Sequence, residues 1–165
     1  MYNDIEKQYQ DNPKQLSNIF RYALYLILCK KAVEALHILN DVDAKDKQNI
    51  VKLYCAKAYK EKNDDENFMF YINQLISSDI SNQAYQEIAE FYLEKAIKLK
   101  KKIKEEKQKE NKELNEKVKR FINLARDNFD KSLEIKEFQT VLFSYGNLEY
   151  FEKNYNKAKI FMKKY

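Results

Sequence analysis

The chain of 165 residues contains one glycine, one proline, one histidine, two cysteines and no tryptophan. Proteins rich in β-sheet reverse direction with glycine, proline and Asn-Gly turns, so the near absence of these residues argues against a sheet fold. The abundant Lys, Glu, Leu, Ala and Gln favour helices. Composition therefore predicts an all-α protein.

Long apolar stretches are also missing. The longest uninterrupted run covers residues 22–29, far short of the roughly 20 residues that a transmembrane helix needs. Residues 1–6 lack the basic and apolar segments of a secretory signal. We therefore expect no membrane insertion and an intracellular, cytoplasmic location. In that reducing environment Cys29 and Cys55 are expected to be free thiols on apolar helical faces.

Little in the sequence supports catalysis. His37 has no nearby cysteine or carboxylate pattern that would make it a metal ligand or a triad base. One glycine cannot build a glycine-rich phosphate loop. The carboxylates of residues 64–66 suit the start of a helix. We expect no enzymatic activity, no cofactor, no metal and no small-molecule substrate.

A small residue among large apolar ones recurs along the chain. Ala23, Ala56 and Ala89 follow one another at intervals of 33 residues, and Gly146 has the same kind of neighbours. Large side chains at spacings of three place each set on one helical face. A second apolar pair comes after each set, as at residues 35 and 39 and at residues 68 and 72.

This period and spacing resemble the tetratricopeptide repeat family. The resemblance implies a right-handed superhelical solenoid of helical hairpins, in which the small residue lies where two helices cross too closely for a large side chain. Pro13 stands where the family closes a preceding repeat. Lys52, Phe68 and Glu149 depart from the family pattern, Glu149 taking the place of a tyrosine.

We expect one domain over residues 1–165, with a partial repeat at 1–13 and full repeats at about 16–47, 49–80, 82–137 and 139–165. The expected helices cover about 2–10, 16–29, 32–43, 48–61, 65–77, 82–106, 110–135, 138–152 and 155–164. Neither end carries a polar cap, so we expect either a piece of a longer solenoid or a subunit whose ends other chains cover.

The third copy carries 24 additional residues within about 95–120, which we name the basic hairpin. Extending both helices by about 12 residues would project a helix pair by roughly 18 Å, turning near residues 108–111. Its lysines are candidates for a second contact: Lys100, Lys101, Lys102, Lys104, Lys107, Lys109 and Lys112. Two interpretations stay open, a solvated helix pair and a contact with an acidic partner, either nucleic acid or a tubulin-like protein. The hairpin lacks aromatic residues that could stack on bases.

In tetratricopeptide arrays the first helix of each hairpin lines an inner wall. The resemblance assigns this wall to Phe20, Leu24, Ile27, Leu28, Leu53, Lys57, Lys60, Gln86, Glu90, Leu93, Phe143, Asn147, Tyr150 and Phe151. Such a groove would hold a partner helix or an extended segment. The apolar composition of residues 19–28 fits either a centrally packed helix or an apolar anchor site. Because the wall lacks the usual lysine, asparagine and arginine set, recognition of a chaperone tail is disfavoured.

The sequence supports three hypotheses of function. The first is a non-catalytic scaffold or adaptor subunit that binds a protein partner in its groove. The second is a basic helical-repeat protein that contacts RNA or ribonucleoprotein through the basic hairpin. The third is a segment that only forms part of the frame of a larger repeat protein.

Overall fold

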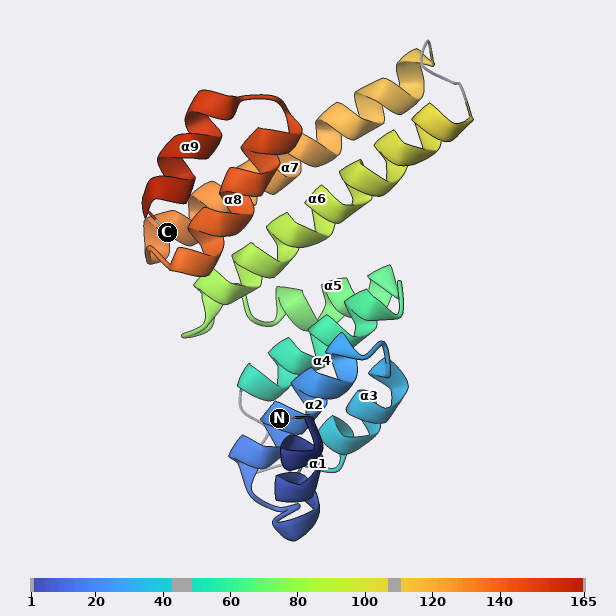
Figure 1. The fold of residues 1–165 in the computed structure, drawn as a ribbon, viewed down its shortest axis with the longest axis vertical. Coiled ribbons are helices and arrows are strands. Elements are labelled where there is room, and N and C mark those ends of the chain that lie inside the picture. The colour runs from blue at the N-terminus through green and yellow to red at the C-terminus, as the bar shows by residue number, and fades with distance from the viewer. Residues whose placement is uncertain (1, 43–48, 107–110, 165) are drawn as a thin grey trace. The chain divides into compact units, whose positions relative to one another are not determined.

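The computed structural model describes residues 2–42, 49–106 and 111–164, and the regular elements within these ranges are all helices (Figure 1). The prediction of an all-α protein is confirmed. The helices are α1 (Tyr2–Asp11), α2 (Leu16–Leu28), α3 (Ala32–Asn40), α4 (Asn49–Glu61), α5 (Asp65–Asn73), α6 (Ser81–Glu105), α7 (Lys112–Ile135), α8 (Gln139–Phe151) and α9 (Tyr155–Lys164).

Most helix boundaries lie within two residues of those expected from the sequence pattern. An exception is α5, which ends at Asn73 instead of residue 77. There the hydroxyl of Ser78 donates to the carbonyl of Leu75 and accepts from the amide of Ile80. Serine side chains that bond the local backbone in this way compete with the helix and favour a turn.

The chain forms two compact units, residues 1–80 (unit 1) and residues 81–165 (unit 2). The division falls between the second and third repeats of the sequence. Each unit stacks its helices in the same order. In unit 1, α2 and α3 pair and α4 packs against both; in unit 2, α6 and α7 pair and α8 packs against both. Hairpins stacked on their neighbours are thus present in each unit, whereas one continuous superhelix stays a prediction.

Unit 1 explains why α2 is apolar on all sides. This helix packs against α1, α3 and α4, and its residues Ile19, Ala23, Leu26 and Ile27 are buried in one core cluster. On the α1 side, the ring of Tyr22 stacks on Tyr9 with centroids 4.7 Å apart. The interpretation of a centrally packed helix is therefore confirmed over most of its length.

In unit 2 the antiparallel helices α6 and α7 extend beyond α8 and α9 (Figure 1). Ile103 and Val118 are buried between the two extensions, and Leu99 and Leu114 pack beside them. The expected lengthening of both helices is confirmed. The expected turn lies outside the described residues, except for Asn111, whose side chain caps α7 by accepting from the amide of Leu114.

The small residues occupy close helix crossings. Ala23, Ala56 and Ala89 have no exposed surface, and Gly146 is buried in α8. A Cβ atom added to Gly146 would lie 3.1 Å from the Cγ of Met162 and 3.6 Å from the carbonyl oxygen of Ala158. A side chain at position 146 would thus crowd Met162 of α9, so the glycine serves close packing between helices and not an unusual backbone conformation.

The hairpin turns use a left-handed residue that is not glycine. Lys30, Asn63 and Lys153 have φ values of 62°, 58° and 64°, and each lies seven residues after the small residue of its copy. In each turn the amide of the next residue donates to a carbonyl five positions back, with distances of 2.8 Å, 3.0 Å and 2.8 Å. This is the Schellman pattern of a helix C-terminus. The three hairpins therefore share one register in their hydrogen bonds.

We expect Lys153→Gly to stabilise the protein by about 0.5–1 kcal/mol, because glycine adopts positive φ without the steric cost that a Cβ atom incurs. Asn63→Gly should give a smaller gain, since asparagine tolerates this conformation better than lysine. Urea unfolding followed by circular dichroism measures both. As a control, Lys159→Gly within α9 should destabilise by about 1 kcal/mol; a loss of stability in Lys153→Gly as well would contradict the role assigned to the turn.

Asp64 caps the start of α5. Its carboxylate accepts a hydrogen bond from the side-chain amide of Asn67 at 2.9 Å and from the backbone amide of Asn67 at 3.2 Å. These bonds, that of the side chain first, lower the pKa of Asp64. A lowered pKa in the folded state contributes stability above the unfolded pKa of about 3.9 and loses it as the pH falls through the folded value.

Asp64→Ala should therefore lower the melting temperature at pH 7, and the difference from the unchanged protein should shrink as the pH falls below about 4. Thermal melts across a pH series measure this. Glu66→Ala, two residues later in the first turn of α5, leaves the cap in place and serves as the control. A difference that stays constant down to the lowest pH would show that the charge of Asp64 is not involved.

Candidate partner-binding surface

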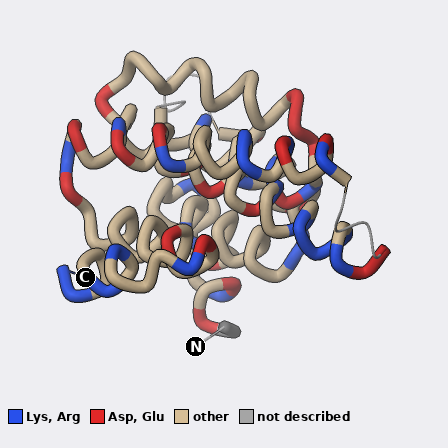
Figure 2. The backbone as a smooth tube through the Cα atoms, turned by 90° about the horizontal axis from the view of Figure 1, so that it is seen from above, with Lys and Arg blue, Asp and Glu red and all other residues tan. Residues whose placement is uncertain are grey.

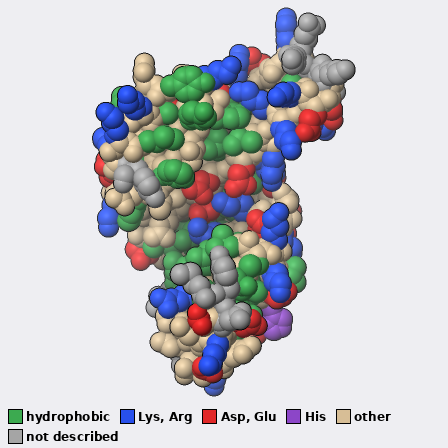
Figure 3. All heavy atoms as spheres, viewed as in Figure 1, with side chains coloured by type: hydrophobic (Ala, Val, Ile, Leu, Met, Phe, Trp, Pro, Cys, Tyr) green, Lys and Arg blue, Asp and Glu red, His purple; other side chains and the backbone are tan. Residues whose placement is uncertain are grey.

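The clearest candidate surface is the face of α8 that its packing leaves open. Phe143, Asn147 and Tyr150 lie on one side of this helix at spacings of four and three residues. Phe143 is 45% exposed and Tyr150 is 62% exposed, and Asn147 is exposed between them. Figure 3 shows hydrophobic side chains gathered over this part of unit 2. Large apolar side chains that remain accessible beside a well-packed core are typical of a contact surface.

Polar hydrogen bonds join the wall positions of α6 to α8. The side-chain amide of Gln86 donates to Glu90 at 2.9 Å. From α8, the hydroxyl of Thr140 donates to Gln86 at 3.3 Å and that of Ser144 donates to Glu90 at 2.9 Å. The structure thus brings the predicted wall residues Gln86 and Glu90 of α6 against α8, and it leaves an acidic, hydrogen-bonded strip beside the helix that carries the exposed aromatic side chains.

Lys100 of α6 contacts the C-terminal end of α8. Its ammonium nitrogen lies 4.2 Å from the ring centroid of Phe151 and 3.7 Å from Glu152. Both contacts reach from α6 to the end of α8. The sequence pattern placed Lys100 among the lysines of the basic hairpin, but in the structure it lies against α8 and not in the projecting part. Phe151 is half-buried beneath it.

Several predicted wall residues are buried and cannot line an open groove in this structure. Ile27 belongs to the core cluster of unit 1 and Leu93 to that of unit 2, and Leu53 is 3% exposed. The prediction is wrong at these positions because these helices pack against more than one neighbour, as α2 does against α1, α3 and α4. Spacing along one helix does not show how many neighbours it will have.

The remaining wall positions of unit 1 form a less open surface. Phe20 stacks on Tyr54 of α4 with centroids 5.5 Å apart, and Leu24 is half-buried. Leu28 is 74% exposed at the end of α2. Lys57 and Lys60 of α4 are half-buried. Only part of the predicted wall is therefore accessible here, and its apolar component is mainly Leu28.

The projecting part of the basic hairpin has mixed charge. Lys101 pairs with Glu105 at 3.7 Å and Lys102 with Glu106 at 3.8 Å, and both blue and red segments lie beside the grey trace at its tip (Figure 2). Lys104 and Lys112 are exposed. Lys107 and Lys109 lie outside the described residues. Exposed pairs of this kind are weak, yet they neutralise much of the positive charge.

The sequence pattern did not reveal a buried ion pair in unit 2. Glu149 is 1% exposed, and its carboxylate accepts from the Nε of Arg126 at 3.0 Å and from the side chain of Asn154 at 2.6 Å. Burial alone would lower the pKa of Arg126, but the hydrogen bond and the charge of Glu149 raise it. The departure of Glu149 from the family pattern was the available signal, and its partner, 23 residues earlier, was not predictable from spacing.

Beside this pair, the hydroxyl of Tyr145 donates to Asp130 at 2.9 Å. Burial, followed by this hydrogen bond, raises the pKa of Tyr145. The ring also stacks on Phe129 and on Phe161, at 5.2 Å and 4.3 Å between centroids. Tyr145 thus holds α7, α8 and α9 together through its ring and one polar bond.

The described residues contain no group of three or more side chains placed to hold a metal ion. His37 is exposed and pairs with Asp41 one helical turn away, at 3.1 Å. Cys55 is buried as expected, but Cys29 is exposed at the C-terminus of α2, so its expected place on an apolar face is wrong. Among the helices described, none is long and apolar enough to cross a membrane.

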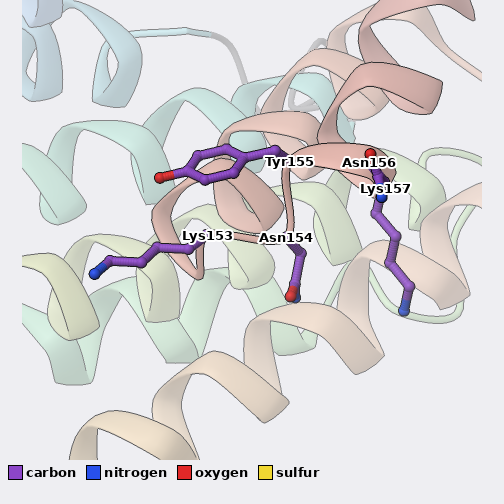
Figure 4. A pocket seen from close by; sticks show the side chains of 5 residues that line it. All are labelled: Lys153, Asn154, Tyr155, Asn156 and Lys157. Carbon is purple, nitrogen blue, oxygen red and sulfur yellow. The ribbon is translucent and has the colours of Figure 1, made fainter.

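The α8–α9 turn carries a further feature that spacing did not reveal. A hollow of about 380 Å³ is lined by Lys153, Asn154, Tyr155, Asn156 and Lys157 (Figure 4). Because the hollow arises from the reversal at Lys153, its existence depended on the three-dimensional turn.

Comparison with protein-family models gives no match to this chain. Comparison with curated proteins also gives no match. The relation to tetratricopeptide repeats therefore stays a resemblance in residue pattern, and the structure adds the shared hairpin register.

Glu149→Leu should destabilise the protein by about 3 kcal/mol, because it leaves the guanidinium of Arg126 without its buried partner. Adding Arg126→Leu should recover part of this loss, because it removes the uncompensated charge. Leucine is tolerated at position 149 in the repeat pattern, since Leu26 fills the equivalent position of the first copy. Urea unfolding of the single and double variants measures both effects. The control is Glu137→Ala, whose pair with Lys164 is more than half exposed on both sides and should matter by less than about 1 kcal/mol. Equal losses in the single and double variants would exclude a coupled pair.

Proposed function

We propose that this protein is a non-catalytic interaction module of the helical-repeat type, and that it binds a protein partner along the exposed face of α8. The observation that carries the proposal is the row of Phe143, Asn147 and Tyr150, whose aromatic side chains stay accessible beside a fully packed hairpin. Aromatic side chains of this kind are enriched among the residues that dominate binding energy in protein interfaces.

The form of the row favours an elongated partner. Its positions trace one helical stripe, and the hydrogen-bonded strip of Gln86 and Glu90 runs beside it on α6. An amphipathic helix or an extended segment matches such a stripe, with apolar residues against the rings and polar or basic residues toward Glu90. This assigns to the α6–α8 wall of unit 2 the adaptor role expected from the repeat pattern.

The alternative, binding of RNA or ribonucleoprotein through the basic hairpin, has less support. Lys101 and Lys102 each have a carboxylate partner one turn away, and Lys119 pairs with Glu116 at 3.2 Å. Nucleic-acid binding depends on cations that are free to replace counterions on phosphates. The pairs and the buried apolar contacts of Ile103 and Val118 suit a solvated, self-supporting helix pair.

The test is affinity purification of the full chain with quantitative mass spectrometry, followed by calorimetry with each purified partner. A partner that binds this surface should lose at least about tenfold in affinity with Phe143→Asp, because an aromatic anchor is replaced by a charge. Asn147→Arg should have a similar effect by blocking the row, and it changes no packed side chain.

The matched control is the double variant Lys101→Gln, Lys102→Gln, which should leave the affinity unchanged. Circular dichroism confirms that every variant keeps its helices. Partners that are released by the lysine variant and retained by both α8 variants would refute the proposal and favour the basic hairpin.

A further inference from the structure

The α8–α9 turn combines positive charge with accessible aromatic rings. Residues 153–164 contain five lysines and no aspartate or glutamate. Lys164 pairs with Glu137, but Lys153, Lys157, Lys159 and Lys163 are exposed and form no ion pair with a described carboxylate. In the basic hairpin, by contrast, Lys101 and Lys102 each pair with a glutamate one turn away. The α8–α9 turn and α9 thus present a cluster of exposed lysines with no acidic residue between them.

Two tyrosine rings lie next to these lysines. Tyr150 is 62% exposed and Tyr155 is 57% exposed. The rings meet edge to face with centroids 5.4 Å apart and an interplanar angle of 64°. Since an edge-to-face pair leaves ring faces uncovered, both tyrosines retain surface on which a planar group can stack.

The hollow at the turn is lined by Lys153, Tyr155 and Lys157. Its lining residues Lys153 and Tyr155 extend in one direction in Figure 4, and Asn154 and Lys157 extend in another. The backbone beneath them is fixed, because the amide of Lys153 donates to Tyr150 at 3.0 Å and that of Asn154 to Glu149 at 2.8 Å. The side chain of Asn154 is also bound to Glu149. The hairpin therefore holds in place the backbone that carries the lining residues.

We propose that the α8–α9 turn binds single-stranded nucleic acid, with a base stacked on Tyr155 and phosphates bound by Lys153 and Lys157. Aromatic side chains beside unpaired cations are the combination that binds unpaired bases together with their backbone. Asn156 adds an amide that can bond a base edge. The carboxylate side chains of an acidic peptide would bind the lysines but carry no ring to stack on Tyr155, and a duplex keeps its bases stacked inside.

This site adjoins the α8 row that the proposed function uses, because Tyr150 belongs to the row and its ring contacts that of Tyr155. The row is tested at Phe143 and Asn147, and the turn at Lys153, Tyr155 and Lys157. Either site can fail its test while the other holds, so the two results are distinguishable.

The experiment is fluorescence anisotropy of the full chain with a labelled oligouridine of about 12 nucleotides, within the usual range of single-strand sites. Over a series of salt concentrations, log affinity should fall against log salt with a slope of about −2 to −3, as expected for three to four phosphate contacts. An oligothymidine of equal length tests whether the site distinguishes RNA from DNA. Comparable binding of both fits recognition through base stacking and phosphates.

Two variants test the assigned contacts. Tyr155→Ala should weaken binding about tenfold, whereas Tyr155→Phe should retain it, since stacking needs the ring and not the hydroxyl. The double variant Lys153→Gly, Lys157→Gln should reduce the magnitude of the salt slope by about 1.4, or roughly 0.7 for each phosphate that is no longer bound. Glycine is used at position 153 because its φ is 64°. Thermal melts verify that these variants remain folded.

The matched control is again Lys101→Gln, Lys102→Gln, which removes the same charge from the basic hairpin and should change the slope by less than half as much. The proposal is overturned if this control loses as much affinity as the turn variant, or if Tyr155→Ala binds like the unchanged protein. Equal binding of a duplex, or displacement of the oligonucleotide by an equal charge concentration of polyglutamate, would likewise overturn it.

Discussion

Each short hairpin of this protein depends on one residue with positive φ just after its first helix, at Lys30, Asn63 or Lys153. The reversal takes so few residues that the second helix starts in a fixed rotational phase relative to the first. That phase brings the small residue of the first helix against the second, as Gly146 meets Ala158 and Met162. A hairpin of this kind has too little interior to be stable alone, so each unit adds a neighbouring helix that contacts both members of the pair.

The third copy lacks this reversal. Ala96 occupies the place of the left-handed residue, but it lies inside α6 and is fully buried. The helix therefore continues, and the added length requires a core of its own. Ile103 and Val118 supply that core, and Lys100 ties the base of the extension to Phe151 of α8. The insertion is thus an elongation of the α6–α7 hairpin and not a separate element.

Charge is distributed according to helix geometry as well as composition. In the basic hairpin, lysines and glutamates four residues apart lie on one helical face and neutralise each other. In α9 the same density of lysine has no acidic residue within the helix. The basic hairpin therefore mixes both signs of charge, whereas the α8–α9 end presents exposed lysines with no acidic residue between them. The exposed aromatic side chains of unit 2 lie at α8 and this same end, which is why both proposed binding surfaces fall there.

The sequence by itself determined the helical class, most helix boundaries, the small-residue crossings and the lengthened third hairpin. These features are local, because turn residues, helix propensity and spacing along one helix act within a few residues. Tertiary structure decided which faces remain open: it buried Ile27, Leu53 and Leu93, and it joined Glu149 to Arg126. Exposure depends on how many neighbours a helix acquires, and a buried charge depends on a partner from another helix. Spacing within one helix contains neither kind of information.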